Sequence, residues 1–267
     1  MTGFGVRLLE AMRARGELCV GIDPHAALLR DWGLGDDVAG LAAFGEICAE
    51  AFAGSAAVVK PQSAFFERFG ASGIEVLERL VSACRTVGTL VLLDVKRGDI
   101  GSTMAAYAEA YLNPSAPLGV DAITVSPYLG VGALEPAFDA AHKFGAGVFV
   151  LALTSNPEAA QTQRVLAQGI VDEVAERNAG TEPLGSFGVV VGATVGKLIV
   201  DLSLLNGPVL VPGVGAQGGT VADVRRLFGV RPGLLPSVSR GVLRAGPDVT
   251  ALRSAAARLT NELSAHQ

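Results

Sequence analysis

Short apolar runs rich in valine, isoleucine and leucine recur along the chain, and a longer stretch with helical spacing follows most of them. Because the runs are nearly continuous in hydrophobicity instead of alternating, they are typical of a parallel sheet that is buried on both faces. Strand–helix alternation of this kind predicts right-handed βαβ units. The eight runs are Leu18–Asp23, Ala57–Gln62, Thr89–Lys96, Ala122–Pro127, Gly147–Ser155, Phe187–Thr194, Pro208–Gly215 and Leu234–Val242.

Stretches with helical spacing separate the runs, and the segment Met1–Glu17 is expected to form a further helix. Eight strand–helix units predict an α/β fold, a single (β/α)8 TIM barrel over residues 1–267, in preference to an open doubly wound sheet. No Pro/Gly/Ser-rich linker divides the chain. The predicted helices are Val38–Ala53, Gly73–Val87, Thr103–Leu112, Gly132–Lys143, Glu158–Asn178, Thr220–Phe228 and the shorter Gly196–Leu204.

Polar residues gather at the carboxyl ends of the runs. In a barrel these ends converge on one face, where active sites are built, so we expect the site there. The residues concerned are Asp23, Lys60, Asp94, Lys96, Ser126, Thr154, Pro212 and Arg240.

Composition narrows the possible functions. The net charge of −5 provides no basic field for nucleic acid. The charge-free apolar stretch around Gly145–Pro157, near strand length, is too short to cross a bilayer. Cys19, Cys48 and Cys84 are widely spaced and form no C-x-x-C pattern, so they are interpreted as buried hydrophobes in a reducing compartment. These features predict a cytoplasmic protein with neither a nucleic-acid nor a membrane partner.

The segment Asp94–Ile100 carries the strongest candidate chemistry. Residues two apart on a strand share a face, so Asp94 and Lys96 are expected to point the same way, either into the barrel near its mouth or toward the helices. A charge packed against the helices would be costly unless it were paired. Asp99 falls beyond the strand, near the start of the next helix. An alternative interpretation is a structural Asp–Lys pair that closes the barrel mouth, with Asp99 as an acid at a helix N-terminus.

Lys60 ends the second run, which neighbours the third run in a barrel. It could be a surface lysine whose stem lies along apolar surface, or it could meet Asp94 directly. An array of lysines and aspartates that alternate in sign keeps both lysines charged. Such a lysine suits a proton donor better than a Schiff-base nucleophile.

Gly213, Gly215 and Gly218 match G-x-G-x-x-G. A dinucleotide site is not favoured, because the motif follows the seventh run and no acid lies near twenty residues on. With Arg240-Gly241 after the eighth run, the turn fits the phosphate site that barrels build from their last two loops, although a flexible turn beside a surface arginine is the alternative. Asp23 could accept a hydrogen bond from a sugar hydroxyl or cap the next helix. No spacing of histidine, cysteine and acid predicts a metal site.

Together these residues resemble the orotidine 5′-phosphate decarboxylase family. Its signature Asp-x-Lys-x-x-Asp-Ile is matched at Asp94–Ile100, and the Asp23-Pro24-His25 and Lys60-Pro61-Gln62 forms are similar to its longer bacterial subgroup. The resemblance implies conversion of orotidine 5′-phosphate to uridine 5′-phosphate and carbon dioxide, the last step of de novo UMP biosynthesis. It implies a homodimer with active sites at the interface and no metal or cofactor.

The same resemblance implies roles for the residues at the run ends. Lys96 would donate the proton to ring carbon 6, and Asp94 would lie against the departing carboxylate. Lys60 would orient Asp94 and touch the ribose. Asp23 would bind a ribose hydroxyl, whereas Asp99 and Thr103 would reach the partner's site. Ser126 and the backbone near Pro212 would read the pyrimidine edge. The phosphate would be held by Gln217, Gly218, Arg240 and Gly241.

Two features depart from the family pattern, and two other functions remain open. Shorter relatives carry glycine where Ser239 stands, and the stretch between Gly213 and Arg240 differs from theirs. The long, charged segment Ser155–Gly185 is interpreted as a helix with loops. One alternative is a magnesium-dependent sugar-phosphate lyase of the same barrel superfamily, which would need a further carboxylate where Lys60 stands. The other is a non-catalytic barrel that binds a nucleotide phosphate.

Overall fold

The eight predicted strands are present and form a closed barrel in the order β1 to β8, with every neighbouring pair parallel. The computed structural model describes residues 2–215 and 218–265. Pairing of Cys19 with Ser237 joins β1 to β8 and closes the ring. The (β/α)8 prediction is therefore confirmed. The strands are β1 (Cys19–Ile22), β2 (Val58–Pro61), β3 (Leu90–Arg97), β4 (Ala122–Val125), β5 (Gly147–Leu153), β6 (Phe187–Val191), β7 (Val209–Val211) and β8 (Leu234–Val238).

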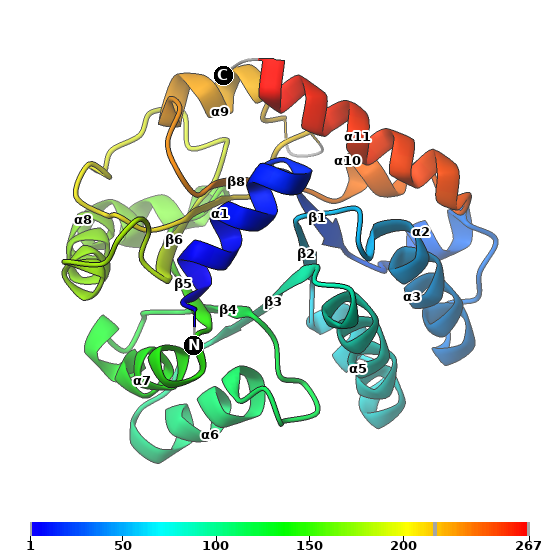
Figure 1. Ribbon diagram of the computed structural model, residues 1–267, viewed down its shortest axis with the longest axis horizontal. Coiled ribbons are helices and arrows are strands. Elements are labelled where there is room, and N and C mark those ends of the chain that lie inside the picture. The colour runs from blue at the N-terminus through cyan, green and yellow to red at the C-terminus, as the bar shows by residue number, and fades with distance from the viewer. Residues whose placement is uncertain (1, 216–217, 266–267) are drawn as a thin grey trace.

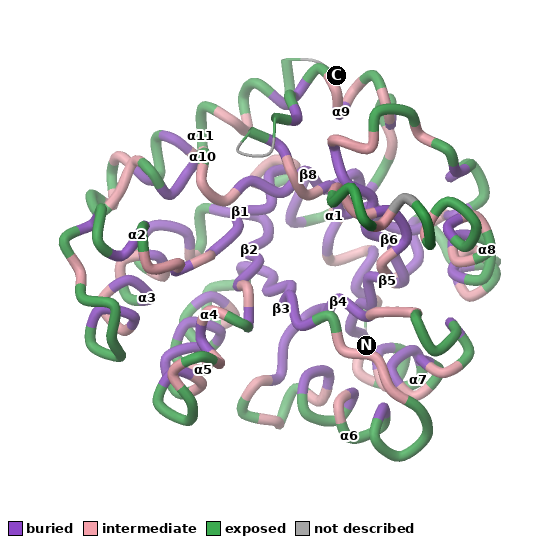
Figure 2. Tube along the Cα trace, turned by 180° about the vertical axis from the view of Figure 1, so that it is seen from behind, coloured by how far each residue is buried: buried purple, intermediate pink, exposed green. Residues whose placement is uncertain are grey.

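Helices surround the ring of strands (Figure 1), and the strands form its buried centre (Figure 2). In the described chain no helix combines the length and apolar character needed to cross a membrane. The surrounding helices are α2 (Ala26–Asp31), α3 (Val38–Phe52), α4 (Ala64–Glu67), α5 (Gly70–Thr86), α6 (Gly101–Leu112), α7 (Glu135–Phe144), α8 (Ala160–Asn178), α9 (Val221–Phe228), α10 (Arg240–Leu243) and α11 (Val249–Ala265), with 3₁₀ turns η1 (Val131–Leu134) and η2 (Pro157–Ala159).

Two differences from the predicted elements have local causes. Residues 196–204 form bends, irregular backbone and a turn instead of the predicted helix. Gly196 has φ +73°, and the Asp201 carboxylate accepts a hydrogen bond from Ser203 N at 2.8 Å. This side-chain bond gives the backbone an alternative to helix. Helix α11 is absent from the predicted helices, although its alanine- and leucine-rich sequence has high helix propensity.

Helix α1 (Phe4–Arg15) closes the amino-terminal end of the barrel, where it crosses the ring in Figure 1. Phe4 and Leu8 are fully buried in the same apolar cluster as the inward-facing Leu92 and Phe149. The rings of Phe4 and Phe149 meet edge to face, with centroids 5.9 Å apart. The predicted N-terminal helix is thus confirmed, and it fills this end of the barrel with side chains.

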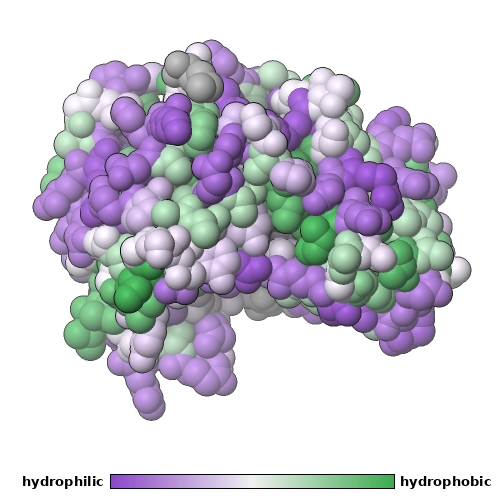
Figure 3. Space-filling model, turned by 90° about the horizontal axis from the view of Figure 1, so that it is seen from below, coloured by the Kyte–Doolittle hydropathy of each residue, from purple (hydrophilic) through white to green (hydrophobic). Residues whose placement is uncertain are grey.

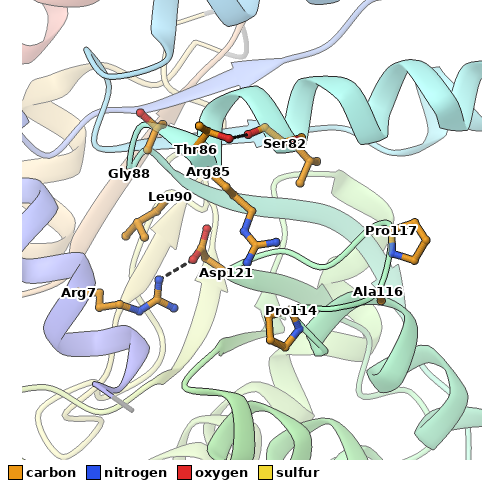
Figure 4. A pocket seen from close by; sticks show the side chains of 12 residues that line it. Arg7, Ser82, Arg85, Thr86, Gly88, Leu90, Pro114, Ala116, Pro117 and Asp121 are labelled. Atoms are coloured by element: carbon orange, nitrogen blue, oxygen red, sulfur yellow. Dashed lines mark hydrogen bonds and ion pairs between the residues drawn. The ribbon is translucent and has the colours of Figure 1, made fainter.

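A partly buried ion pair fixes α1 to the strands. Arg7 Nη1 lies 2.5 Å from Asp121 Oδ1, and Val91 N donates to the other carboxylate oxygen at 2.9 Å. A cavity of about 600 Å³ lies beside this pair, with Arg85 on its wall (Figure 4). Because it adjoins the amino-terminal end of β3, it is remote from the carboxyl ends of the strands. None of the predicted site residues lines it.

Replacing Asp121 with alanine should lower the free energy of unfolding by about 2–3 kcal/mol, because Arg7 loses its ion pair and Val91 N–H is left unsatisfied. The value is at the low end for a buried pair since the Arg7 side chain is 30% exposed. Urea unfolding measures the change. Asp139→Ala, at an exposed site on α7, is the control and should change stability by less than about 0.5 kcal/mol. Equal stability of the two variants would contradict the structural role of Asp121.

Candidate active site

A cavity of about 260 Å³ opens at the carboxyl ends of the strands, opposite α1. Charged side chains from β2, β3 and the residue after β1 form one wall, and apolar side chains from β5, β6 and β7 form the other. This is the face predicted for the site, and all eight strands or their ends contribute to its lining. In strand order these contributions include Asp23, Lys60, Asp94, Thr124, Leu151, Val190, Leu210 and Ser237.

The charged wall is built around the Asp94 carboxylate. Lys60 Nζ lies 2.7 Å from Asp94 Oδ2, and Lys96 Nζ lies 2.5 Å from Asp94 Oδ1. Thr124 Oγ1 also donates to Oδ1 at 2.8 Å. The predicted contact between Lys60 and Asp94 is therefore confirmed. The Lys60 and Asp94 side chains are buried, whereas that of Lys96 is 45% exposed. Lys96 is thus the most exposed member of the array, and all three residues line the cavity.

The array stays ionised because each buried charge has an opposite neighbour. Burial raises the pKa of Asp94, but Lys60 and Lys96 outweigh it and hold that pKa well below its usual range. Burial likewise lowers the pKa of Lys60, and the Asp94 and Asp23 charges reverse the effect and raise it above its ordinary value. A buried carboxylate and a buried ammonium group are therefore both maintained in the charged form near neutral pH.

Lys96 reaches this position through an irregularity in β3. The register against β4 shifts between Leu93 and Arg97, and Lys96 has φ +45°, a conformation that non-glycine residues rarely adopt. Lys96 N donates to Thr124 Oγ1 at 3.0 Å, in place of a regular ladder partner. Asp94 and Lys96 do share the cavity as predicted, but a bulge and not simple alternation brings them together.

Two cavity residues hold buried polar atoms that lack partners among the described residues. These are Asp23 Oδ1 and Ser239 Oγ. An unsatisfied buried polar atom costs about 1–3 kcal/mol, which a ligand hydroxyl at this place would recover. Asp23 does not cap the next helix, because His25 does so by accepting from Leu28 N at 3.2 Å. Of the two interpretations of Asp23, the structure favours ligand contact.

The glycine-rich turn after β7 lies at the same cavity as Arg240. Gly213, Gly215 and Gly218 have φ between +80° and +94°, which glycine adopts without strain. Gly213 and Arg240 line the cavity together with Pro212. Strand β8 ends at Val238 and Arg240 begins α10, so the last predicted strand is too long. Gly218 and Gly241 are exposed and outside the lining, and Gln217 lies outside the described residues.

Three further predicted site residues, besides Gly218 and Gly241, do not line this cavity in the single chain. Asp99 Oδ1 accepts from Ile100 N at 2.8 Å, and Thr103 is exposed on α6. Ser126 follows β4, where its carbonyl passes so close to Gly98 that a Cβ there would lie 2.4 Å from the oxygen. Their expected contacts with substrate stay predictions.

Several lining residues were not predicted. Thr124 bonds Asp94 and the Lys96 backbone, and Gln62 lies 3.4 Å from Lys60 Nζ. Residues two apart on a strand share a face, so both could have been found from the predicted site residues. Thr124 lies two residues before Ser126, and Gln62 lies two residues after Lys60. Ser237 precedes Ser239 by the same interval, and both line the cavity.

The fold and the cavity define the class of protein. A closed barrel with its polar, partly unsatisfied cavity at the strand ends places the chain among the (β/α)8-barrel enzymes. Comparison with known families identifies the particular group. The chain belongs to the Orotidine 5'-phosphate decarboxylase / HUMPS family, whose model matches residues 16–255.

Similar proteins come from several bacteria. The chain is 60% identical to an orotidine 5'-phosphate decarboxylase of Salinispora arenicola, over 97% of this chain and 96% of that protein. It is 59% identical to an enzyme of the same name from Streptomyces coelicolor, over 98% of each chain. A crystal structure titled as a putative orotidine 5'-phosphate decarboxylase from Streptomyces avermitilis is 57% identical, with a TM-score of 0.97 and coverage of 100% of this chain and 96% of that one.

Proposed function

We propose that the chain catalyses the decarboxylation of orotidine 5′-phosphate to uridine 5′-phosphate and carbon dioxide, the last step of de novo UMP biosynthesis. The observation that carries the proposal is the Lys96 ammonium, held by Asp94 at 2.5 Å and exposed to the cavity. Loss of carbon dioxide from ring carbon 6 leaves a carbanion with no adjacent carbonyl to delocalise it. A fixed ammonium stabilises this charge and then supplies the proton.

The remaining members of the charged wall have supporting roles in the proposed reaction. Asp94 lies against the substrate carboxylate, and Lys60 orients Asp94. Asp23 accepts from a ribose hydroxyl, which its unpartnered Oδ1 supports. Because Asp94 is held ionised, it disfavours the substrate carboxylate and not the neutral carbon dioxide that leaves.

The apolar wall supports the binding of a flat pyrimidine ring. Leu151, Val190 and Leu210 face the charged array across the cavity, so the ring lies with its reacting carbon toward Lys96. The backbone near Pro212 and the Ser126 side chain are proposed to read the polar edge of the ring.

The phosphate group is proposed to lie at the corner formed by the glycine-rich turn and Arg240. The arginine side chain and the backbone N–H of Gly241 are proposed as donors there, with Gln217 and Gly218 completing the corner. Because Gly218 N donates to the Gly215 carbonyl at 2.9 Å in the structure, this N–H would have to exchange that bond for the phosphate. Since the chain carries a net charge of −5, these local donors must overcome an unfavourable overall field for an anionic substrate.

Replacing Arg240 with alanine should weaken substrate binding by about 2–4 kcal/mol, which is a rise in KM of roughly 30- to 1,000-fold, because a charge-assisted contact is lost. Steady-state kinetics and calorimetry with uridine 5′-phosphate measure the change. Arg244→Ala, an exposed arginine after the same short helix, is the control and should bind as the wild type does. An unchanged affinity of the Arg240 variant would show that the phosphate lies elsewhere.

A homodimer with shared active sites is part of the proposal. The start of α6 is exposed at Gly101, Ser102 and Thr103. Two large apolar side chains that follow β3 and β4 are also exposed: Ile100 is 62% exposed and Tyr128 is 83% exposed. Figure 3 shows apolar patches among polar side chains on the face seen from below, the side on which α6 and α7 lie. Burial of such a surface by a second copy would carry Asp99 and Thr103 toward the partner's cavity.

Mixing Asp99→Ala subunits with Lys96→Ala subunits tests this arrangement. Each homodimer should be inactive, but a mixed dimer holds one site with both residues intact. At equal amounts, half of the dimers are mixed, so about a quarter of the wild-type activity should return. Differently tagged subunits allow the mixed dimer to be purified. If a purified mixed dimer were inactive, Asp99 would be serving its own chain.

The donor set favours a metal-free reaction. Both oxygens of Asp94 accept hydrogen bonds from ammonium groups, and a cation would have to displace them. Across residues 2–215 and 218–265, no three His, Cys, Asp or Glu side chains form a group that could hold a metal ion. A magnesium-dependent lyase therefore lacks a visible ligand set here.

The direct test is the ultraviolet change on incubation of orotidine 5′-phosphate with the purified protein in excess chelator. Rapid formation of uridine 5′-phosphate is expected. Conversion that stops on chelation would favour the magnesium-dependent alternative. Tight binding of uridine 5′-phosphate without any conversion would favour a non-catalytic binding barrel.

A cytoplasmic location also belongs to the proposal. Cys19, Cys48 and Cys84 are buried and unpaired, and burial raises the pKa of Cys19 and of Cys84 to about 12. These thiols act as small apolar side chains, which is typical of proteins in a reducing compartment.

A further inference from the structure

Arg97, the residue after Lys96, is bonded on the side of β3 that faces the helices. Its Nη2 lies 2.6 Å from Glu67 Oε1 at the end of α4 and donates to the Tyr111 hydroxyl at 3.1 Å. Its guanidinium also lies 5.5 Å from the ring centroid of Tyr107. Arg97 does not line the cavity. Its contacts therefore fasten β3 to α4 and α6 from outside the site.

The same contacts extend to the strand that carries Lys60. Ser63 follows β2, is 3% exposed, and donates from Oγ to Glu67 Oε1 at 2.6 Å. Its backbone N donates to the Asp94 carbonyl at 3.3 Å. Glu67 thus accepts from both Ser63 and Arg97 through one oxygen. The bonds join the segment after β2 to β3 on each side of the bulge.

The bulge needs such support because its central residue is strained. A non-glycine residue at φ +45° costs about 1–3 kcal/mol and persists only where its surroundings fix it. Inside the barrel, Lys96 is held by Asp94 and Thr124. Arg97 is the first residue beyond the bulge that pairs with β4 again, opposite Val125, and its carbonyl accepts from Ser126 N at 2.8 Å. Its side chain fixes this end from outside.

We infer that Arg97 is a positioning residue: its ion pair with Glu67 and its contacts with Tyr111 hold the β3 bulge so that the Lys96 ammonium stays on Asp94. The inference rests on the proposed function for its kinetic readout only. Arginine is required because a planar guanidinium can bond Glu67 and the Tyr111 hydroxyl together while it lies against aromatic rings. Lysine can replace the charge but not this geometry.

Arg97→Met should lower kcat by about 10- to 100-fold, the effect expected when a reacting group is displaced by about 1 Å, with KM changed less than about threefold. Affinity for uridine 5′-phosphate should be unchanged, since no cavity side chain is altered. Arg97→Lys should recover part of kcat. A merely structural role would lower the melting temperature and leave kcat unaltered well below it.

Arg68→Met is the matched control. Arg68 also pairs with a carboxylate, Asp36, and lies over an aromatic ring, that of Phe69, and its side-chain exposure is 35% against 28% for Arg97. These partners lie before α3 and after α4, not on β3, so the kcat of Arg68→Met should equal that of the wild type. A kcat of Arg97→Met equal to that of Arg68→Met would overturn the inference.

Glu67→Gln supplies a second, milder variant for the case that Arg97→Met does not fold. It should lower kcat in the same direction, and the Arg97→Lys, Glu67→Gln double variant should lose less than the product of the two single effects, because both changes break one ion pair. Independent effects would count against the inference.

A crystal structure of the Arg97 variant separates this inference from the proposed function. We expect φ of Lys96 to leave the positive region or its Nζ to move from Asp94. If both stay in place, the positioning role is wrong even in an active enzyme. If the wild type does not act on orotidine 5′-phosphate, the proposed function fails, and the structural readout still decides the role of Arg97.

Discussion

Replacement of Lys96 by alanine is expected to abolish turnover, with a loss of more than about 10⁴-fold in kcat. Two contributions disappear together: the cation that stabilises the carbanion and the proton that ends the reaction. Uridine 5′-phosphate should still bind with nearly wild-type affinity, since the product has no carboxylate near Lys96. The remaining pair of Lys60 and Asp94 is neutral as a whole, so the fold should survive the change. Single-turnover kinetics and calorimetry measure these two quantities.

Two further lysine variants sharpen the test. Lys96→Arg keeps a cation but provides a much weaker acid, so any activity it retains measures electrostatic stabilisation apart from proton transfer. Lys143→Ala, at an exposed site on α7, is the control and should have wild-type kinetics. Substantial turnover by Lys96→Ala would exclude Lys96 as the proton donor, and the search for the acid would then move to Lys60.

The barrel and much of the site could be predicted from the sequence because both depend on local patterns. Strands that are buried on both faces need continuous apolar runs, so the runs reveal the strands. A polar residue at the carboxyl end of a run lies at the mouth of the barrel, whatever the exact register of that strand against its neighbours. Lys60 and Asp94 illustrate this. They lie toward the carboxyl ends of the neighbouring strands β2 and β3, and in the closed parallel barrel Lys60 Nζ lies 2.7 Å from Asp94 Oδ2.

The bulge at Lys96 could not be predicted, because strand alternation assumes regular backbone. A positive φ at lysine opposes local propensity and exists only where Asp94 and Thr124 hold it. The role of Asp23 was likewise undecidable from sequence, since aspartate and the nearby His25 can both cap a helix and only the structure shows His25 doing so. The contacts proposed for Asp99 and Thr103 involve a second copy of the chain, so the structure of one chain does not test them.

Asp94→Asn should lower the free energy of unfolding by about 3–5 kcal/mol and remove most activity. The amide keeps the shape of the side chain but leaves the Lys60 ammonium buried without its principal partner, which is the costly way to break a buried pair. It also releases the Lys96 ammonium from the position in which the carboxylate holds it. Urea unfolding and steady-state kinetics measure the two losses. Asp139→Asn on the surface is the control for the loss of one negative charge.

The pH dependence of the free energy of unfolding should distinguish Asp94→Asn from the wild type. In the wild type, the lowered pKa of Asp94 contributes stability above its unfolded value near about 3.9, which is lost as the pH falls through the folded pKa. The raised pKa of Lys60 contributes stability below about 10.4, which is lost as the pH rises through the folded pKa. Between these limits the pair is fully effective, and its contribution to stability should not change with pH.

In Asp94→Asn, burial still lowers the pKa of Lys60, and Asp23 is the main negative charge left to raise it. We therefore expect the pKa of Lys60 to fall below its ordinary value. The unfolded chain then binds more protons than the folded one, and stability must rise with pH. Unfolding measured from about pH 6 to about pH 9 should therefore show a positive slope in the variant, over and above any slope of the wild type. A variant whose slope matches that of the wild type would mean that Lys60 has found another anion or has reached solvent, and the structural account of the buried pair would be wrong.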